Sequence, residues 1–339
     1  MARISLFLTV FLASCASILS IPNFAHALTI TPIRYEIQGD PGQTLKEEMT
    51  LVNETKTAQT YYASFANFEA QGDSGSPTFI DPREGLGTWM ATDVASINLA
   101  PGQQKVVPFT ITIPKNAEPG GHFAAIFWGT SFGSKPGELT IGAKTGLLVL
   151  LTVNGDIAES AGLVDFQTHN KKHFFRALPV GFQYRFSNQG GDRVKPDGNI
   201  VVRSIFGWRV QKINANPFDG NVLPGTTRKF TTEWAKKDSV ADRDEVAALG
   251  APYSFTKTLA YEWHNFALGI FRAKLDAQFG ATAQHIKSKS VYFVVVPWEL
   301  LLVCIVVGTP LYFILRAMLR KYNRAIIRRA QQLGTAKSQ

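Results

Sequence analysis

An apolar run near the end of the chain, VVVPWELLLVCIVVG at residues 294–308, constrains the fold more than any other stretch. It is apolar enough to enter a lipid bilayer, but Pro297, Trp298 and Glu299 interrupt it early. The run is therefore either part of one transmembrane helix or a buried strand that passes into a helix at Pro297. The choice between them decides where the folded part of the chain ends.

The N-terminus has the pattern of an export signal. Arg3 is followed by an apolar stretch at residues 4–21 and by Ala25-His26-Ala27, the small-x-small pattern that a signal peptidase requires. We therefore predict that residues 1–27 are removed. An alternative is a bacterial lipoprotein box at Leu12-Ala13-Ser14-Cys15, in which Cys15 would be acylated.

The formal net charge of +9 is concentrated behind the second apolar segment. A basic tail beside an apolar helix is what the positive-inside rule expects on the cytoplasmic side of a membrane. The rest of the mature chain is close to neutral, which argues against a nucleic-acid partner. We predict a single-pass protein of the cell membrane, with extracellular N-terminal domains and a short cytoplasmic tail at residues 316–339. The basic residues of the tail are Arg316, Arg320, Lys321, Arg324, Arg328, Arg329 and Lys337.

Short runs of alternating apolar residues dominate the exported part. Val107, Phe109, Ile111 and Ile113 alternate with more polar neighbours, as antiparallel strands do, and Gly- and Pro-containing turns separate such runs. Long helical periodicity is nearly absent before the membrane segment, apart from one short helix expected at residues 242–249. Both cysteines lie in the apolar segments, so no disulfide supports the exported part. The pattern predicts an all-β fold of immunoglobulin-like β-sandwiches.

An internal repeat divides this part into two. Leu99-Ala100-Pro101-Gly102 has a counterpart in Val222-Leu223-Pro224-Gly225, and each is followed by a strand that contains Phe-Thr. Further on, the pattern Gly-x-Phe-x-Ala-x-apolar begins at Gly121 and again at Gly269. We therefore predict two tandem sandwiches, at residues 28–157 and 158–296.

The repeat also resolves the apolar run. In the first half, the segment 145–153, TGLLVLLTV, follows the Gly-x-Phe-x-Ala pattern as a buried strand, and the corresponding place in the second half holds residues 291–296. We therefore assign 291–296 to the last strand and 297–315 to a transmembrane helix. The alternative is one continuous helix over residues 291–315.

Several residues would then mark the ends of the membrane helix. Pro297 suits the first helical position, because its missing N–H would have no partner there. Trp298 fits the interfacial aromatic belt, and Glu299 would lie near the headgroups and the positive helix end. Pro310 inside the span predicts a kink. We expect the membrane interfaces at Trp298, Glu299, Arg316, Arg320 and Lys321.

With these motifs, the chain resembles the WxL-interacting proteins of bacterial cell surfaces. The residues that carry the likeness are Ile30-Thr31-Pro32, Trp89, Leu99-Ala100-Pro101-Gly102 and the run at 113–126, which contains Pro-Gly-Gly-His-Phe-Ala-Ala. The resemblance implies an N-terminal domain of peptidoglycan-binding type, a second sandwich, one transmembrane helix and a basic tail. This chain departs from the family in a long loop at residues 234–265.

No enzyme motif is present, and we expect neither catalysis nor a cofactor. Phosphate loops, dinucleotide fingerprints, nucleophile elbows and zinc-protease motifs are all missing from the sequence. His169 and His173 have the i, i+4 spacing of helical metal ligands, but the two lysines between them favour a solvated loop. Asn53-Glu54-Thr55 fits a glycosylation pattern and is better explained as a turn.

Aromatic residues are the remaining candidates for ligand binding. Tyr61, Tyr62 and Trp89 would form a sugar-stacking surface on the first domain, although alternate aromatics also fill sandwich cores. Adjacent tyrosines on a strand point to opposite faces, so one of them must face outward. We predict a non-enzymatic surface protein that binds cell-wall glycan. The alternative is a scaffold that docks another surface protein.

Overall fold

The computed structural model describes residues 28–130, 144–236, 255–280, 282–286 and 290–335. The predicted signal segment with Cys15 and the helix expected at 242–249 lie outside this part. The described chain forms two compact units, each with its own core. The first comprises residues up to Glu69 and Thr78–Ile157, and the second Ala70–Pro77 with everything from Ala158 onward.

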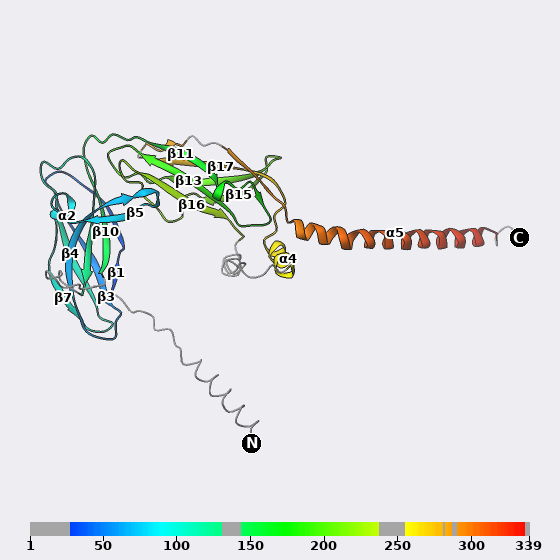
Figure 1. Ribbon diagram of the computed structural model, residues 1–339, viewed down its shortest axis with the longest axis horizontal. Coiled ribbons are helices and arrows are strands. Elements are labelled where there is room, and N and C mark those ends of the chain that lie inside the picture. The colour runs from blue at the N-terminus through cyan, green and yellow to red at the C-terminus, as the bar shows by residue number, and fades with distance from the viewer. Residues whose placement is uncertain (1–27, 131–143, 237–254, 281, 287–289, 336–339) are drawn as a thin grey trace, which may run out of the picture. The chain divides into compact units, whose positions relative to one another are not determined.

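The first unit is a β-sandwich of two sheets (Figure 1). One sheet has the order β1-β3-β8-β6, formed by Leu28–Thr31, Thr44–Asn53, Gln104–Thr112 and Met90–Thr92. The other has the order β2-β10-β9-β4-β5, formed by Arg34–Gly39, Lys144–Val153, Gly120–Gly129, Gln59–Gln71 and Ser76–Ile80, with β7, Ser96–Leu99, paired to β4. A short helix, α2 at Leu86–Trp89, interrupts the strands, whereas η1 at Gly72–Ser74 lies in the segment Ala70–Pro77 that belongs to the second unit.

The second unit has a related architecture. Its smaller sheet has the order β11-β13-β16, formed by Ala161–Thr168, Val180–Asn188 and Thr227–Trp234. Its larger sheet has the order β12-β19-β17-β14-β15, formed by Phe174–Phe175, Ser290–Val295, Gly269–Phe279, Asp197–Ser204 and Arg209–Asn214, with β18, Gln284–His285, paired to β17. Its helices are η2 at His169–Lys171, α4 at Phe255–His264 and α5 at Trp298–Thr335.

The alternating residues face the cores as their period predicts. In β8, Val107, Phe109 and Ile111 are all buried in the core of the first unit. In β13, buried and partly exposed residues alternate over the whole strand, with Phe182 and Tyr184 inside. The all-β fold of two immunoglobulin-like sandwiches followed by one apolar helix is thereby confirmed.

Strand pairing reproduces the sequence repeat. β10 pairs in parallel with β2 and antiparallel with β9, and β19 pairs in the same two ways with β12 and β17. The Pro-Gly turns also correspond, because Gly102 and Gly225 have φ values of 70° and 69°, which glycine adopts without steric cost. The run at 145–153 lies in β10, between β2 and β9, and its alternate residues Leu147, Val149, Leu151 and Val153 are buried in the core of the first unit.

Each turn is held by a buried asparagine at the end of an earlier strand. Asn53 Nδ2 donates to Leu99 O at 2.9 Å, and Asn188 Nδ2 donates to Val222 O at 2.9 Å. Both side chains are fully buried. Asn53 also accepts hydrogen bonds from the Thr55 backbone and the Tyr61 hydroxyl, so this side chain is part of the fold and a turn is the correct explanation of its motif.

The apolar run is a strand followed by a helix, and the continuous helix over 291–315 is wrong. β19 ends at Val295 and α5 begins at Trp298. Pro297 O accepts the first helical hydrogen bond, from Leu301 N at 3.0 Å, so Pro297 is the N-cap. The prediction had placed Pro297 at the first helical position, and the helix therefore begins one residue later, at Trp298. α5 continues through Pro310 and past Arg316 to Thr335.

Candidate functional site

The two adjacent tyrosines point to opposite faces of β4. Tyr61 is 3% exposed within the core, and its hydroxyl donates to Asn53 Oδ1 at 3.0 Å. Burial raises the pKa of the Tyr61 hydroxyl, so it stays protonated as a donor. Tyr62 is partly exposed and pairs with Gly129 of β9. Tyr61 therefore presents no ring face to a ligand, and the outward residue is Tyr62.

Trp89 lies at the end of α2 and is partly buried against the core. Its ring contacts the His122 ring in a tilted arrangement, with the centroids 4.7 Å apart and the ring planes at 50°. His122 and Gly129, the partner of Tyr62, are seven residues apart on β9, which corresponds to about 23 Å along a strand. Trp89 and Tyr62 consequently do not form one surface.

A groove of about 860 Å³ opens at the end of β4 and β9 where α2 lies. Aromatic rings form its floor: Phe68 contacts Phe123 at 5.9 Å and Phe79 at 6.1 Å between centroids. Phe79 also packs edge-on against Phe127 at 4.8 Å and remains 43% exposed. This cluster was not predicted from the sequence, although the outward positions of the strand GGHFAAIFWG carry two phenylalanines, which is the signal for a second apolar face.

Charged residues line the other wall of the groove. Asp81, Arg83 and Glu84 are exposed along its rim, and Glu69 also lines it. Asn67 holds the loop that carries these charged residues in place. Its Nδ2 donates to Glu84 O at 2.6 Å, and its Oδ1 accepts from Gly87 N at 2.8 Å. The wall is therefore fixed by hydrogen bonds before any ligand binds.

His169 and His173, which have the i, i+4 spacing in sequence, do not lie on one α-helix. η2 spans His169–Lys171, and His173 Nδ1 lies 2.9 Å from Tyr292 O. Among the residues that the structure describes, no group of three His, Cys, Asp or Glu side chains is arranged to hold a metal ion.

Polar contacts at the root of α5 were not foreseen. Glu262 of α4 is fully buried, and its Oε2 accepts the N–H of Leu300 at 2.9 Å. Proline at the N-cap has no side-chain acceptor, so Glu262 supplies the cap from another helix. Burial first, and the charge of Glu299 next, raise the pKa of the Glu262 carboxyl, while the Leu300 hydrogen bond and Arg176 lower it.

The expected membrane-interface residues divide into two groups. Glu299 is fully buried, and its Oε1 lies 3.3 Å from Arg176 Nη1, so it contacts protein and does not face headgroups as expected. Trp298 is 40% exposed, with the Arg176 guanidinium 5.3 Å above its ring. Arg316, Arg320 and Lys321 are exposed on α5. The stretch Trp298–Arg324 is long and apolar enough to cross a membrane.

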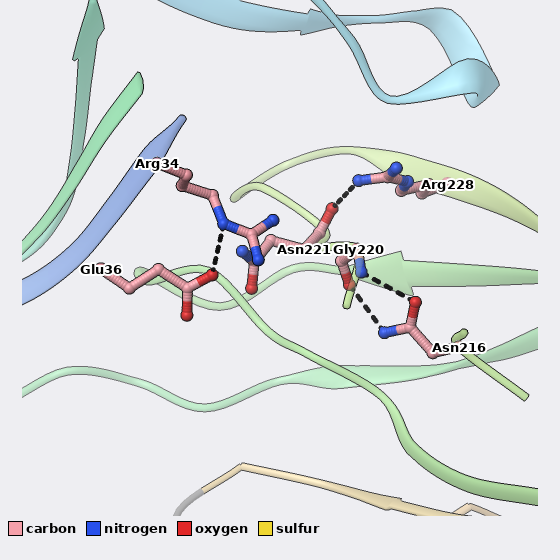
Figure 2. Close-up of polar contacts among 6 residues, drawn as sticks. All are labelled: Arg34, Glu36, Asn216, Gly220, Asn221 and Arg228. Atoms are coloured by element: carbon pink, nitrogen blue, oxygen red, sulfur yellow. Dashed lines mark hydrogen bonds and ion pairs between the residues drawn. The ribbon is translucent and has the colours of Figure 1, made fainter. Parts of the chain in front are cut away.

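Figure 2 shows polar contacts that fix individual loops and strands of the two units. In the second unit, Asn216 closes the loop after β15: its Nδ2 donates to Gly220 O at 3.0 Å and its Oδ1 accepts from Gly220 N at 2.8 Å. Arg228 Nη1 donates to Asn221 O at 2.7 Å. In the first unit, Arg34 Nε lies 3.0 Å from Glu36 Oε1 on β2.

No family model and no curated protein matches the chain. Several solved structures are similar to the chain at low identity and low TM-score. The class 5 fimbriae chaperone CfaA is 12% identical, with a TM-score of 0.35, over 80% of this chain and 100% of that one. The CsuC–CsuE chaperone–tip adhesin complex of Acinetobacter baumannii is 8% identical, with a TM-score of 0.34, over 79% of this chain and 98% of that one. The SafA pilin–SafB chaperone complex of Salmonella enterica is 8% identical, with a TM-score of 0.33, over 80% of this chain and 98% of that one. At TM-scores this low, these likenesses carry no argument about the chain.

Proposed function

We propose that this protein is a membrane-anchored, non-catalytic bacterial surface protein whose first unit binds cell-wall glycan in the groove beside α2. The groove is the observation that carries the proposal, because it combines exposed ring surface with charged acceptors on a fixed wall. Ligand pockets are typically concave and apolar with a few well-placed polar groups. The resemblance to WxL-interacting proteins agrees with this function.

The groove has the chemistry that a saccharide requires. Phe79 offers a ring edge and face to the apolar side of a sugar, as Phe123 does from the floor. Asp81 and Glu84 carry carboxylate oxygens that accept hydrogen bonds from sugar hydroxyls, and Arg83 donates them. The proposed site is therefore the groove and not a surface of Tyr61, Tyr62 and Trp89. Trp89 supports the wall of the groove through its contact with His122.

Anchoring is proposed from α5 and its charges. The apolar stretch from Trp298 would cross the cell membrane, with Arg316, Arg320 and Lys321 on the cytoplasmic side and both sandwiches outside. Removal of residues 1–27 during export belongs to the same proposal.

Cosedimentation of the detergent-solubilised full-length protein with purified cell wall tests glycan binding. Phe79→Ala should weaken binding about tenfold, which corresponds to about 1.4 kcal/mol, and Asp81→Asn combined with Glu84→Gln should weaken it further. Phe218→Ala is the matched control, because Phe218 is an 85% exposed phenylalanine in the second unit. Equal binding by wild type and Phe79→Ala would reject the groove, and no binding by wild type would reject the glycan.

Docking of another surface protein is the second candidate. β15 is an edge strand of the larger sheet in the second unit, and it is exposed at nearly every position. Such an edge accepts an added strand through backbone hydrogen bonds. Cross-linking in intact membranes would favour this function if one protein dominates the products while purified wall is not bound.

A further inference from the structure

Large apolar side chains are exposed at the tip of the β14–β15 hairpin. Ile205, Phe206 and Trp208 are 57%, 78% and 72% exposed, and the Phe206 and Trp208 rings lie 5.6 Å apart. The turn between them is ordered by backbone bonds, with Gly207 N donating to Ser204 O at 2.9 Å. Tight turns favour small and polar residues, so three large apolar side chains at one tip need a partner to cover them.

Strand register places this tip at the end of the sandwich where α5 begins. Ser204 pairs with Phe271, and Ile205 N donates to Ile270 O at 3.0 Å. Two residues before Phe271, Gly269 pairs with Val295, which is three residues before the start of α5 at Trp298. The hairpin tip and the first turn of α5 therefore lie at the same end of one sheet.

Other exposed apolar residues lie at this end. Trp263 is 69% exposed, and the neighbouring Glu262 caps α5. Leu268 is 50% exposed directly before β17. We call Ile205, Phe206, Trp208, Trp263, Leu268 and Trp298 the aromatic rim. Arginines accompany it: Arg203 donates to Gly207 O at 3.1 Å, Arg209 follows the tip, and Arg176 lies over Trp298.

We infer that the aromatic rim lies in the headgroup region of the membrane that α5 crosses, so that the second unit contacts lipid in addition to its anchor. The inference rests on the proposed anchor. If α5 enters the bilayer at Trp298, the membrane surface lies at the end of the sheet where the rim lies. Tryptophan and phenylalanine beside arginine suit the interface, where rings meet the acyl boundary and guanidinium groups meet phosphate.

Fluorescence of the full-length protein in phosphatidylcholine vesicles tests the inference. The vesicles contain lipid brominated near the headgroup end of the acyl chains, which quenches tryptophans at that depth. Subtracting the emission of Trp208→Phe from that of wild type isolates Trp208, and Trp263→Phe isolates Trp263 in the same way. We expect brominated lipid to remove most of the emission of both, and aqueous iodide to remove little of it.

Phe218→Trp provides the matched control. Phe218 lies in the loop after β15, and β15 runs from Arg209 beside the tip to Asn214 opposite Asn199, so this exposed ring is at the far end of the sheet. Its added emission should be quenched by iodide and not by brominated lipid.

Two other results would contradict the placement of the rim in the headgroup region. Quenching of Trp208 by iodide would place it in water, and shielding of Trp208 from both agents would mean that protein covers it. Alkaline extraction of the same vesicles separates the two proposals. If wild type is extracted, the anchor fails; if it stays and Trp208 is not quenched by brominated lipid, only the rim fails.

Discussion

Glu262 offers the sharpest test of how the second unit holds the start of α5. Its carboxylate accepts the Leu300 N–H at 2.9 Å inside a fully buried site. Removing the acceptor leaves a buried N–H unsatisfied, which costs about 1–3 kcal/mol. Relief of the repulsion from Glu299 offsets part of this cost. We expect Glu262→Ala to destabilise the second unit by about 1–2 kcal/mol, or roughly 2–8 °C in Tm for a domain of this size.

Glu262→Gln separates the cap from the charge. Glutamine keeps an oxygen that can accept from Leu300 and removes the negative charge next to Glu299. The folded-state pKa of Glu262 is raised, so its stabilising contribution is complete below the usual carboxyl pKa and is lost as pH rises through the folded value. At pH 8, Glu262→Gln should therefore be as stable as wild type or more stable, and this difference should shrink towards pH 4.

Thermal unfolding of the full-length protein in detergent at pH 4, 6 and 8 measures both effects. Hydrogen exchange of α4 and of the first turn of α5 locates them. Among the described residues, Arg176 and Glu299 are the charged groups that act on Glu262, so buffers of equal ionic strength are needed at each pH. The role of Glu262 as the cap of α5 would be refuted if Glu262→Ala leaves stability unchanged at pH 8, or if Glu262→Gln loses as much stability as Glu262→Ala.

Two further predictions concern the cores. Asn53→Ala should destabilise the first unit and Asn188→Ala the second, each by about 3 kcal/mol or more, because several buried backbone groups lose their partner. Hydrogen exchange should rise mainly in the unit that carries the change. A rise confined to the other unit would contradict this prediction. Tyr184 is fully buried and its hydroxyl has no hydrogen-bond partner in the part of the chain that the structure describes, whereas its ring stacks on Phe230 at 4.9 Å. Tyr184→Phe should leave stability unchanged or raise it by about 1 kcal/mol, and a loss in urea unfolding would show that the hydroxyl is bonded.

The positions of the three aromatics predicted as a ligand surface could be anticipated only in part. Alternation requires one of Tyr61 and Tyr62 to face outward, but it does not say which of them does. Trp89 and Tyr62 lie within one unit, yet the length of β9 separates them. Phe79 and Phe123 are far apart in sequence, and they line one groove only because β5 and β9 flank β4 on its two sides in one sheet.

The root of α5 shows the same limit. Its start was predictable because Pro297 cannot continue a strand ladder and the repeat placed a strand before it. Glu299 looked like an interfacial residue, since nothing local indicates that Arg176 lies 3.3 Å away. α4 was not expected at 255–264, because its buried residues, Thr258 and Glu262, are polar and its contact with α5 helps to stabilise it.

The sequence by itself determined the β class, the repeat and the point at which the strand gives way to the apolar helix. These follow from local rules, since period-two alternation, the restriction at proline and the conformational freedom of glycine act within a few residues. Only the tertiary structure decided which aromatics share a groove, which carboxylate caps α5 and which hairpin tip lies at the end of the sheet where α5 begins. Such contacts depend on strand order and register, and these bring together residues that no local pattern connects.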